Sequence, residues 1–340
     1  MLDGDEVEPK AGVLYDVYVE VGTLLNITEV THNGSPITFD YSNGIVHFVT
    51  DSFSPFAITY KNYKDVSEDA VVESNKIVGG IFTENPAKFD ETLDDEDSEY
   101  IAINYVQDGK TKYIVAERAT TLIVDDGNGY VAENNNYTVK ENVSGNLYKA
   151  TIADTDSRCL MPGAKTLFIL PGTYNEATTI TVPKSMDIIG LGDKEDIKII
   201  MKSSGNRHLF NVNGDVSLAS HIQVTISNLY LDATAYTTSR KDNASVQAIR
   251  MSKVKCYDLI INDGNYPFYV NGKYDARGAY MYVEDCSLIG NIASDWTPFA
   301  LPCALYYSNL TYANGTKEFT TNNNYYTNTT MAPDDWDWEN

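Results

Sequence analysis

Residues 224–231 read VTISNLYL, and thirty positions later residues 254–261 read VKCYDLII. In both stretches apolar residues alternate with polar or aromatic ones, and a small polar residue precedes a leucine. Weaker copies of the pattern follow at residues 283–288 and 305–312. A unit this short cannot bury its apolar face alone, so successive copies must stack on one another.

Each copy predicts two short strands that are separated by a bend at a small polar residue. The predicted bend residues are Asn228, Asp258, Ser287 and Asn309. Alternation inside a repeat of 22 to 30 residues predicts an all-β chain built around a right-handed parallel β-helix. Stacking should place the leucines after the bends in one interior column, with neighbours about 4.8 Å apart. These leucines are Leu229, Leu259, Leu288 and Leu310.

The composition agrees with a strand-rich protein and limits its partners. The 25 tyrosines, together with abundant Thr, Val and Ile, favour strands over helices. A net charge of −23 is incompatible with the basic surface that nucleic acids require, so no nucleic-acid partner is expected. No apolar run is long enough to cross a bilayer, so membrane insertion is not expected.

Residues 1–6 are acidic, whereas a signal peptide begins with a basic segment. We therefore expect the chain to be a piece of a longer exported protein that is extracellular or associated with the cell wall. A cytoplasmic protein is the alternative. The strong negative charge makes copies repel one another, and a monomer is expected.

The N-terminal part has a different pattern. Apolar and polar residues alternate between residues 13 and 60, and two Asn-Gly pairs, at 33–34 and 43–44, supply the positive φ angles of tight hairpins. This pattern predicts a small antiparallel β-module.

The predicted organisation has three parts. Residues 1–62 form the β-module, 63–158 a β-rich transitional segment, and 159–340 the β-helix with a C-terminal capping tail. The sequence leaves open whether the transitional segment belongs to the solenoid. Two tryptophans in the tail, Trp336 and Trp338, favour a cover over the open last coil, with a sugar-stacking strip as the alternative.

Three stretches resemble bacterial surface proteins. Residues 44–58, GIVHFVTDSFSPFAI, resemble the closing strands of small β-modules in Gram-positive surface proteins. Residues 76–86, KIVGGIFTENP, resemble turns in β-helical surface proteins of gut bacteria. Residues 164–192, AKTLFILPGTYNEATTITVPKSMDIIGLG, are similar to the opening coils of pectin-lyase-like β-helices. The resemblance implies a pectin-lyase-like cell-surface protein of a Gram-positive gut bacterium.

The catalytic patterns of the enzymes with this fold are missing. Pectin esterases carry a Gln-Asp pair and an Asp-Phe-x-x-Gly segment, and polygalacturonases carry Asn-x-Asp, Asp-Asp, His-Gly and Arg-x-Lys on neighbouring coils. None of these sets occurs in the late coils, and histidine, the commonest base near neutral pH, is scarce. We therefore expect an adhesin or glycan-binding protein without catalysis. The alternative is a polysaccharide lyase or hydrolase acting on an acidic glycan, because a lyase needs only a single Arg or Lys as its base.

One region departs from the acidic character of the chain. Residues 240–277 carry an excess of three positive charges. Lys253 and Lys255 alternate with inward-facing residues, so both should lie on the outer face. A basic strip bordered by tyrosines suits an acidic glycan on a host or dietary polysaccharide or glycoprotein; a solvated face that moderates the net charge is the alternative. The candidate binding residues are Arg250, Lys253, Lys255, Tyr274, Asp275 and Arg277.

No cofactor is predicted. Residues 91–99 contain six acids in nine positions, but the spacing and central glycine of an EF-hand are missing, so a solvated loop is expected and a calcium site is the alternative. The four cysteines include no Cys-x-x-Cys pair. Cys256 and Cys286 are one coil apart and are expected to be buried free thiols.

Overall fold

A computed structural model shows an all-β chain, which confirms the predicted fold class: a parallel β-helix preceded by a small antiparallel β-domain. The chain forms two compact units, Met1–Asn104 with Thr111–Arg118, and Tyr105–Lys110 with Ala119–Asn340. The structure describes residues 10, 12–127, 139–141, 145–203, 208–215, 217–235, 244–263, 266–271, 278–289 and 303–312. No helix in these ranges has the length and apolar composition of a membrane span.

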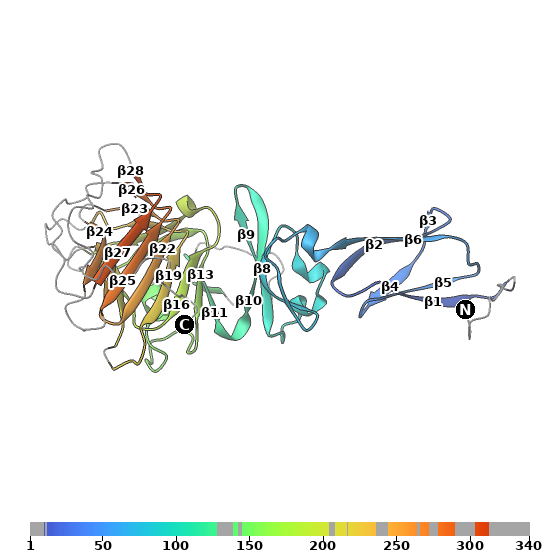
Figure 1. The fold of residues 1–340 in the computed structure, drawn as a ribbon, viewed down its shortest axis with the longest axis horizontal. Coiled ribbons are helices and arrows are strands. Elements are labelled where there is room, and N and C mark those ends of the chain that lie inside the picture. The colour runs from blue at the N-terminus through green and yellow to red at the C-terminus, as the bar shows by residue number, and fades with distance from the viewer. Residues whose placement is uncertain are drawn as a thin grey trace. The chain divides into compact units, whose positions relative to one another are not determined.

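The first unit begins with two three-stranded antiparallel sheets that share one core (Figure 1). Their strands, in sheet order, are β1 (Tyr15–Glu20), β5 (Ile45–Thr50) and β4 (Phe39–Ser42), then β3 (Ser35–Pro36), β2 (Leu25–His32) and β6 (Phe56–Asn62). Val30, Val46 and Phe48 are buried in this core. Both predicted Asn-Gly turns are confirmed, because all four turn residues have positive φ angles between 51° and 82°.

A third antiparallel sheet follows, most of whose residues belong to this unit. It consists, in order, of β7 (Val71–Glu73), β8 (Lys76–Phe82), β10 (Lys110–Glu117) and β9 (Tyr100–Gln107). Short 3₁₀ helices lie beside it in the chain: η1 (Tyr63–Asp65), η2 (Pro86–Lys88), η3 (Glu91–Asp94) and η4 (Arg118–Thr120). Phe82, at the end of β8, is fully buried.

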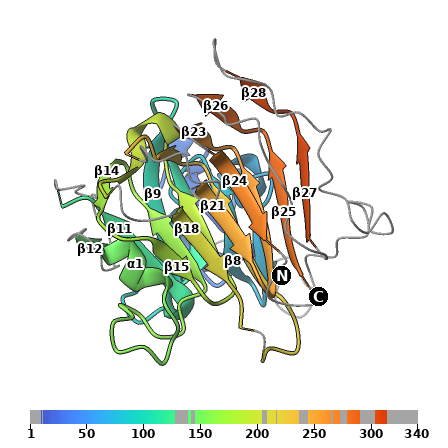
Figure 2. The same ribbon diagram turned by 90° about the vertical axis from the view of Figure 1, so that its left-hand side faces the viewer.

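The second unit is a coil in which three parallel sheets alternate along the chain (Figures 1 and 2). Sheet A contains β12 (Val139–Glu141), β11 (Thr121–Asp125), β13 (Thr166–Ile169), β16 (Met186–Gly190), β19 (Ile222–Ser227), β22 (Ser252–Tyr257), β25 (Ala279–Glu284) and β27 (Cys303–Ser308). Sheet B contains β14 (Gly172–Glu176), β17 (Ile197–Met201), β20 (Tyr230–Asp232), β23 (Ile260–Asn262), β26 (Ser287–Ile289) and β28 (Thr311–Tyr312). Sheet C contains β15 (Ile180–Val182), β18 (His208–Asn213), β21 (Ala244–Ile249) and β24 (Tyr266–Asn271). The helices are α1 (Asn146–Thr151) and the 3₁₀ helix η5 (Lys194–Asp196).

Sheet C is the part that the repeat pattern missed, because the pattern predicted only two strands per copy. Every residue of β21 is buried, so both faces of this strand are covered. A strand buried on both faces loses the polar–apolar alternation that identifies a strand in a sequence.

The parallel stacking of strands begins before residue 159, the predicted start of the β-helix, because β11 already pairs with β13.

The bends between sheets A and B stack on one another in successive coils. Residues at four equivalent positions adopt the left-handed conformation with φ angles from 51° to 54°. They are Asn228, Asp258, Asp285 and Asn309. In the third copy the bend is therefore Asp285, and the prediction of Ser287 is wrong. Asn and Asp tolerate this conformation better than serine does, which is the physical reason for the difference.

This shift changes the predicted leucine column. Cys256 pairs with Val283, so Cys286 occupies the position of Leu259 one coil later. Leu288 pairs instead with Ile261 in the next column, where it is still buried. The column after the bends therefore consists of Leu229, Leu259, Cys286 and Leu310.

Cys256 and Cys286 are buried and free, as predicted. The Cys286 Sγ atom lies 3.9 Å from the carbonyl oxygen of Cys256. Burial raises the pKa of both thiols, that of Cys286 to about 12. Both are therefore protonated at neutral pH and behave as small apolar side chains.

The carboxyl group of Glu176, at the end of β14, lies in the interior of the β-helix. It is fully buried, and neither of its carboxyl oxygens has a hydrogen-bond partner among the described residues. Burial raises its pKa to about 7, against the opposing effect of the nearby Leu147 and Gly145 amides at the start of α1. Glu176 is therefore an interior acid that titrates in the neutral range.

We expect the stability of the β-helix to fall as the pH rises from about 4.5 to about 7. In this window the folded chain keeps a proton on Glu176 that the unfolded chain has already released. The loss should be on the order of 2–3 kcal/mol in the free energy of unfolding. Glu176→Gln cannot ionise, so urea unfolding at several pH values should give a flatter profile. If the free energy of unfolding fell equally steeply with pH in the wild-type protein and in Glu176→Gln, Glu176 would not be the source of the pH dependence.

Candidate functional site

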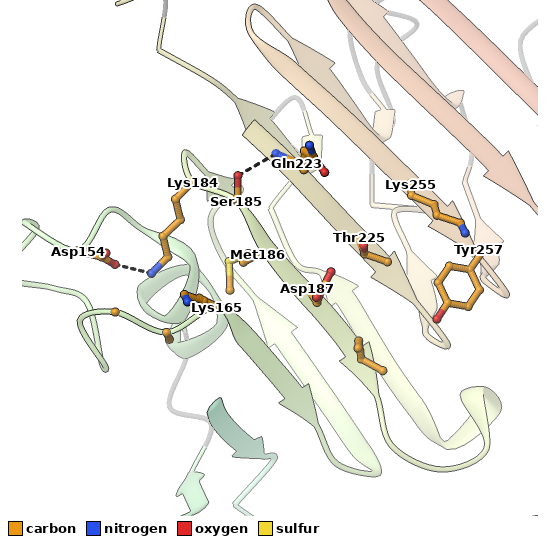
Figure 3. A pocket seen from close by; sticks show the side chains of 13 residues that line it. Asp154, Lys165, Lys184, Ser185, Met186, Asp187, Gln223, Thr225, Lys255 and Tyr257 are labelled. Carbon is orange, nitrogen blue, oxygen red and sulfur yellow. Dashed lines mark hydrogen bonds and ion pairs between the residues drawn. The ribbon is translucent and has the colours of Figure 1, made fainter. Parts of the chain in front are cut away.

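A shallow groove of about 880 Å³ lies on the outer face of sheet A (Figure 3). Residues from β16, β19 and β22 form its floor, and the segments that precede β13 and β16 form one end. The polar residues that line it are Asp154, Lys165, Lys184, Ser185, Asp187, Gln223, Thr225, Lys255 and Tyr257. The groove therefore crosses several coils instead of following one strand.

Strand alternation decides which side chains reach this groove. In β22 the residues at Val254 and Cys256 are buried, while Lys253 and Lys255 between them are partly exposed. The register then aligns Asp187, Thr225 and Lys255 in one row across three successive strands. The apolar residues on the other side of these strands fill the interior and hold the row in place.

One end of the groove holds an ion pair. The Lys184 Nζ atom lies 2.6 Å from Asp154 Oδ1, and this contact lowers the pKa of the Asp154 carboxyl group. Lys165 lies beside this pair (Figure 3). No carboxylate among the described residues forms an ion pair with Lys165.

Lys255 and Tyr257 form the opposite end. The Lys255 Nζ atom lies 5.1 Å from the centre of the Tyr257 ring, which is a cation–π distance. In the part of the chain that the structure describes, no carboxylate pairs with Lys255. Its ammonium group is therefore directed across an aromatic face at the edge of the groove.

Tyrosines continue the surface beyond the lysines. Lys253 pairs with Tyr280 and Lys255 pairs with Tyr282 on the next strand. The Tyr282 hydroxyl lies 3.3 Å from the hydroxyl of Ser308, one strand further on. The tyrosines beside the lysines thus come from β25. The sequence predicted tyrosines at the border of the basic strip, but it did not identify these two.

The six predicted site residues have different outcomes. Lys253 and Lys255 lie on the outer face, and this orientation is confirmed. Arg250 does not line the groove, because it occupies the bend before β22 with a φ angle of 57°. Tyr274, Asp275 and Arg277 lie outside the described residues, so their placement stays a prediction.

Of the nine polar residues that line the groove, only Lys255 was predicted from the sequence, and the charged residues that were missed are Asp154, Lys165, Lys184 and Asp187. Asp187 alternates with two buried residues, Met186 and Ile188, so its outward direction was readable. The sequence could not predict that Asp187 lies two strands away from Lys255, because 68 residues separate the two in the chain. Only the register of β16, β19 and β22 brings them together.

A Ser–His cluster occurs in the β-module. The His32 Nε2 atom contacts the hydroxyl of Ser54 and lies 3.1 Å from that of Ser52, and the His32 ring stacks on Phe56 at 4.5 Å. Within the described ranges no carboxylate pairs with His32 to orient it as a base. The cluster therefore joins the loop after β5 to the end of β2.

The described residues contain no group of three or more His, Cys, Asp or Glu side chains that could hold a metal ion. The acidic loop of residues 91–99 is instead joined to Arg118, whose guanidinium donates to the carbonyl oxygens of Ser98 and Asp95 at 2.9 and 3.1 Å.

The geometry of the groove suits an extended, polar and acidic ligand. Cationic groups at both ends can form charge-assisted hydrogen bonds, and the hydroxyl and amide groups between them can bind uncharged polar groups. Comparison with known proteins gives no match to a family model, to a curated protein or to a solved structure.

Proposed function

We propose that this chain is a glycan-binding adhesin of the bacterial cell surface, built on a pectin-lyase-like β-helix, and that it acts without catalysis. The groove on sheet A binds an acidic polysaccharide, or the acidic glycan of a glycoprotein, of host or dietary origin. The observation that carries the proposal is the presence of Lys165 and Lys255 at opposite ends of one groove in a chain of net charge −23. The resemblance of residues 164–192 to the opening coils of pectin-lyase-like proteins supports the same class.

Several properties of the groove favour a glycan over other anions. Tyr257 and the neighbouring tyrosines offer aromatic faces on which sugar rings stack, and Ser185, Gln223 and Thr225 offer groups for sugar hydroxyls. A nucleic acid carries one charge per phosphate, and an acidic protein repels such a dense polyanion. A polysaccharide with sparser charges is repelled less and gains the stacking contacts.

The proposed setting is outside the cell, either secreted or associated with the cell wall, with the chain acting as a monomer. No cofactor takes part in the proposed binding. An acidic surface keeps an exported, strand-rich protein soluble and limits self-association.

The double substitution Lys253→Glu with Lys255→Glu is expected to weaken binding to acidic polysaccharides at least tenfold. Two attractive charges become repulsive, and each lost contact is worth about 1 kcal/mol or more. The remaining binding should depend less on salt concentration. Titration by isothermal calorimetry against hyaluronan and polygalacturonate at two ionic strengths measures both effects.

Lys198→Glu is the matched control for this experiment. Lys198 also lies over a tyrosine, with its Nζ atom 5.9 Å from the centre of the Tyr230 ring, but on sheet B and outside the groove. Its substitution changes the net charge in the same direction and should leave binding within about twofold, a difference below 1 kcal/mol. Because the control changes the net charge half as much, a loss of binding free energy half as large as that of the double variant would show that overall charge, not the groove, controls binding.

A lyase is the second candidate, because Lys255 and Tyr257 are adjacent in the groove. In a β-elimination a basic lysine would take the proton next to the uronate carboxylate, the bond to the glycosidic oxygen would break, and a tyrosine would protonate that oxygen. We expect no such reaction. Incubation with pectate, alginate, hyaluronan and chondroitin, with calcium present, should produce no ultraviolet absorbance from unsaturated uronate. Product formation that Lys255→Gln abolishes would favour the lyase.

A further inference from the structure

We propose that the groove selects glycans whose acidic sugars are separated by uncharged sugars, as in polymers with a uronate–amino sugar repeat, over glycans with an acid on every sugar. This inference rests on the proposed function, because it names the class of polymer that the same groove binds. It follows from the order of charges across the strands.

The middle of the groove carries a negative charge. Asp187 on β16 is exposed and lies in one row with Thr225 on β19 and Lys255 on β22. Adjacent strands are spaced at about 4.8 Å, so Asp187 and Lys255 lie about 10 Å apart along the row. The residue between them in this row, Thr225, is uncharged.

The other end of the groove offers one ammonium group without a described ion pair. Lys184 is paired with Asp154 and its side chain is only 16% exposed, so its charge is largely compensated. Lys165 immediately precedes β13, three strands from Lys255 in sheet A. The positive groups available to a ligand are therefore separated by about 14 Å of surface, with a carboxylate between them.

This order of charges distinguishes two kinds of polymer. A pyranose ring extends a glycan by roughly the distance between neighbouring coils, so a chain lying across sheet A places about one sugar on each strand. A polymer that is acidic at every sugar must place a carboxylate against Asp187, where like charges repel. A polymer in which every second sugar is acidic can place one carboxylate at Lys165 and the next beside Thr225, one strand from Lys255, so that an uncharged sugar lies beside Asp187.

The test compares hyaluronan with polygalacturonate, using oligosaccharides of equal length and the complete chain, by isothermal calorimetry. Wild-type protein should bind hyaluronan at least fivefold more tightly, although polygalacturonate carries twice the charge per sugar. Asp187→Asn should tighten polygalacturonate binding at least threefold and leave hyaluronan binding within twofold. Asp196→Asn, which removes an exposed carboxylate outside the groove, is the matched control and should change neither affinity.

The outcomes separate this inference from the proposed function. Tighter binding of polygalacturonate by wild-type protein, with no effect of Asp187→Asn, would overturn the selectivity and leave glycan binding standing. Failure to bind either polymer would overturn both. Because Asp187 is exposed, the variant should unfold at the wild-type temperature, and a circular dichroism melt verifies this.

Discussion

Replacing Leu259 by aspartate is expected to unfold the β-helix. Leu259 is completely buried, and its neighbours in the interior column are Leu229 and Cys286 on the adjacent coils. The aspartate would lose the apolar contacts of leucine and place an unpaired charge in an interior without water. We expect a loss of more than about 4 kcal/mol in the free energy of unfolding, which is a large fraction of the roughly 5–15 kcal/mol that stabilises a typical domain.

Circular dichroism melts and limited proteolysis of the full chain measure this effect. The control is Ile289→Asp, which makes the same kind of change at a side chain that is 36% exposed two residues after the start of β26. It should cost less than about 1 kcal/mol. A wild-type melting transition in the Leu259→Asp protein would show that this column is not the core of the solenoid.

Gly190→Ala is expected to have the second-largest effect. Gly190 occupies the bend position one coil before Asn228, and the Asn228 side chain donates hydrogen bonds to the carbonyl oxygens of Gly190 and Gly192 at 2.7 and 2.8 Å. A Cβ atom at residue 190 would lie 2.0 Å from the backbone oxygen of Asn228 and 2.9 Å from a methyl group of Leu229. A backbone atom cannot rotate away, so two coils must separate locally.

The expected cost of Gly190→Ala is roughly 3 kcal/mol or more, above the usual range for one added methyl group in a core. Gly79→Ala is the matched control, because it is also a strand glycine and its Cβ would meet Val71 at an ordinary distance of 3.5 Å. Urea unfolding of both variants, followed by circular dichroism, compares the two costs. Similar small losses would mean that the coils can move apart at this corner.

The residues of the groove differ in how far a local sequence pattern can predict their position. Lys253 and Lys255 were identified on the outer face from the sequence, because strand alternation is a local property of neighbouring residues. Their partners in the groove were not identified. Lys165 and Asp187 lie in other coils, and only the register of sheet A places them within two or three strands of Lys255.

The sequence alone determined the all-β class, the stacked repeat and both Asn-Gly hairpin turns, because alternation and turn chemistry are local and each copy repeats them. The tertiary structure alone decided three further features. It added sheet C, whose strand β21 is buried on both faces and therefore carries no alternation. It moved the third bend to Asp285, since the register of neighbouring coils decides which residue takes the left-handed conformation. It also assembled the groove, because stacking coils converts residues far apart in the chain into neighbours about 5 Å apart across the strands.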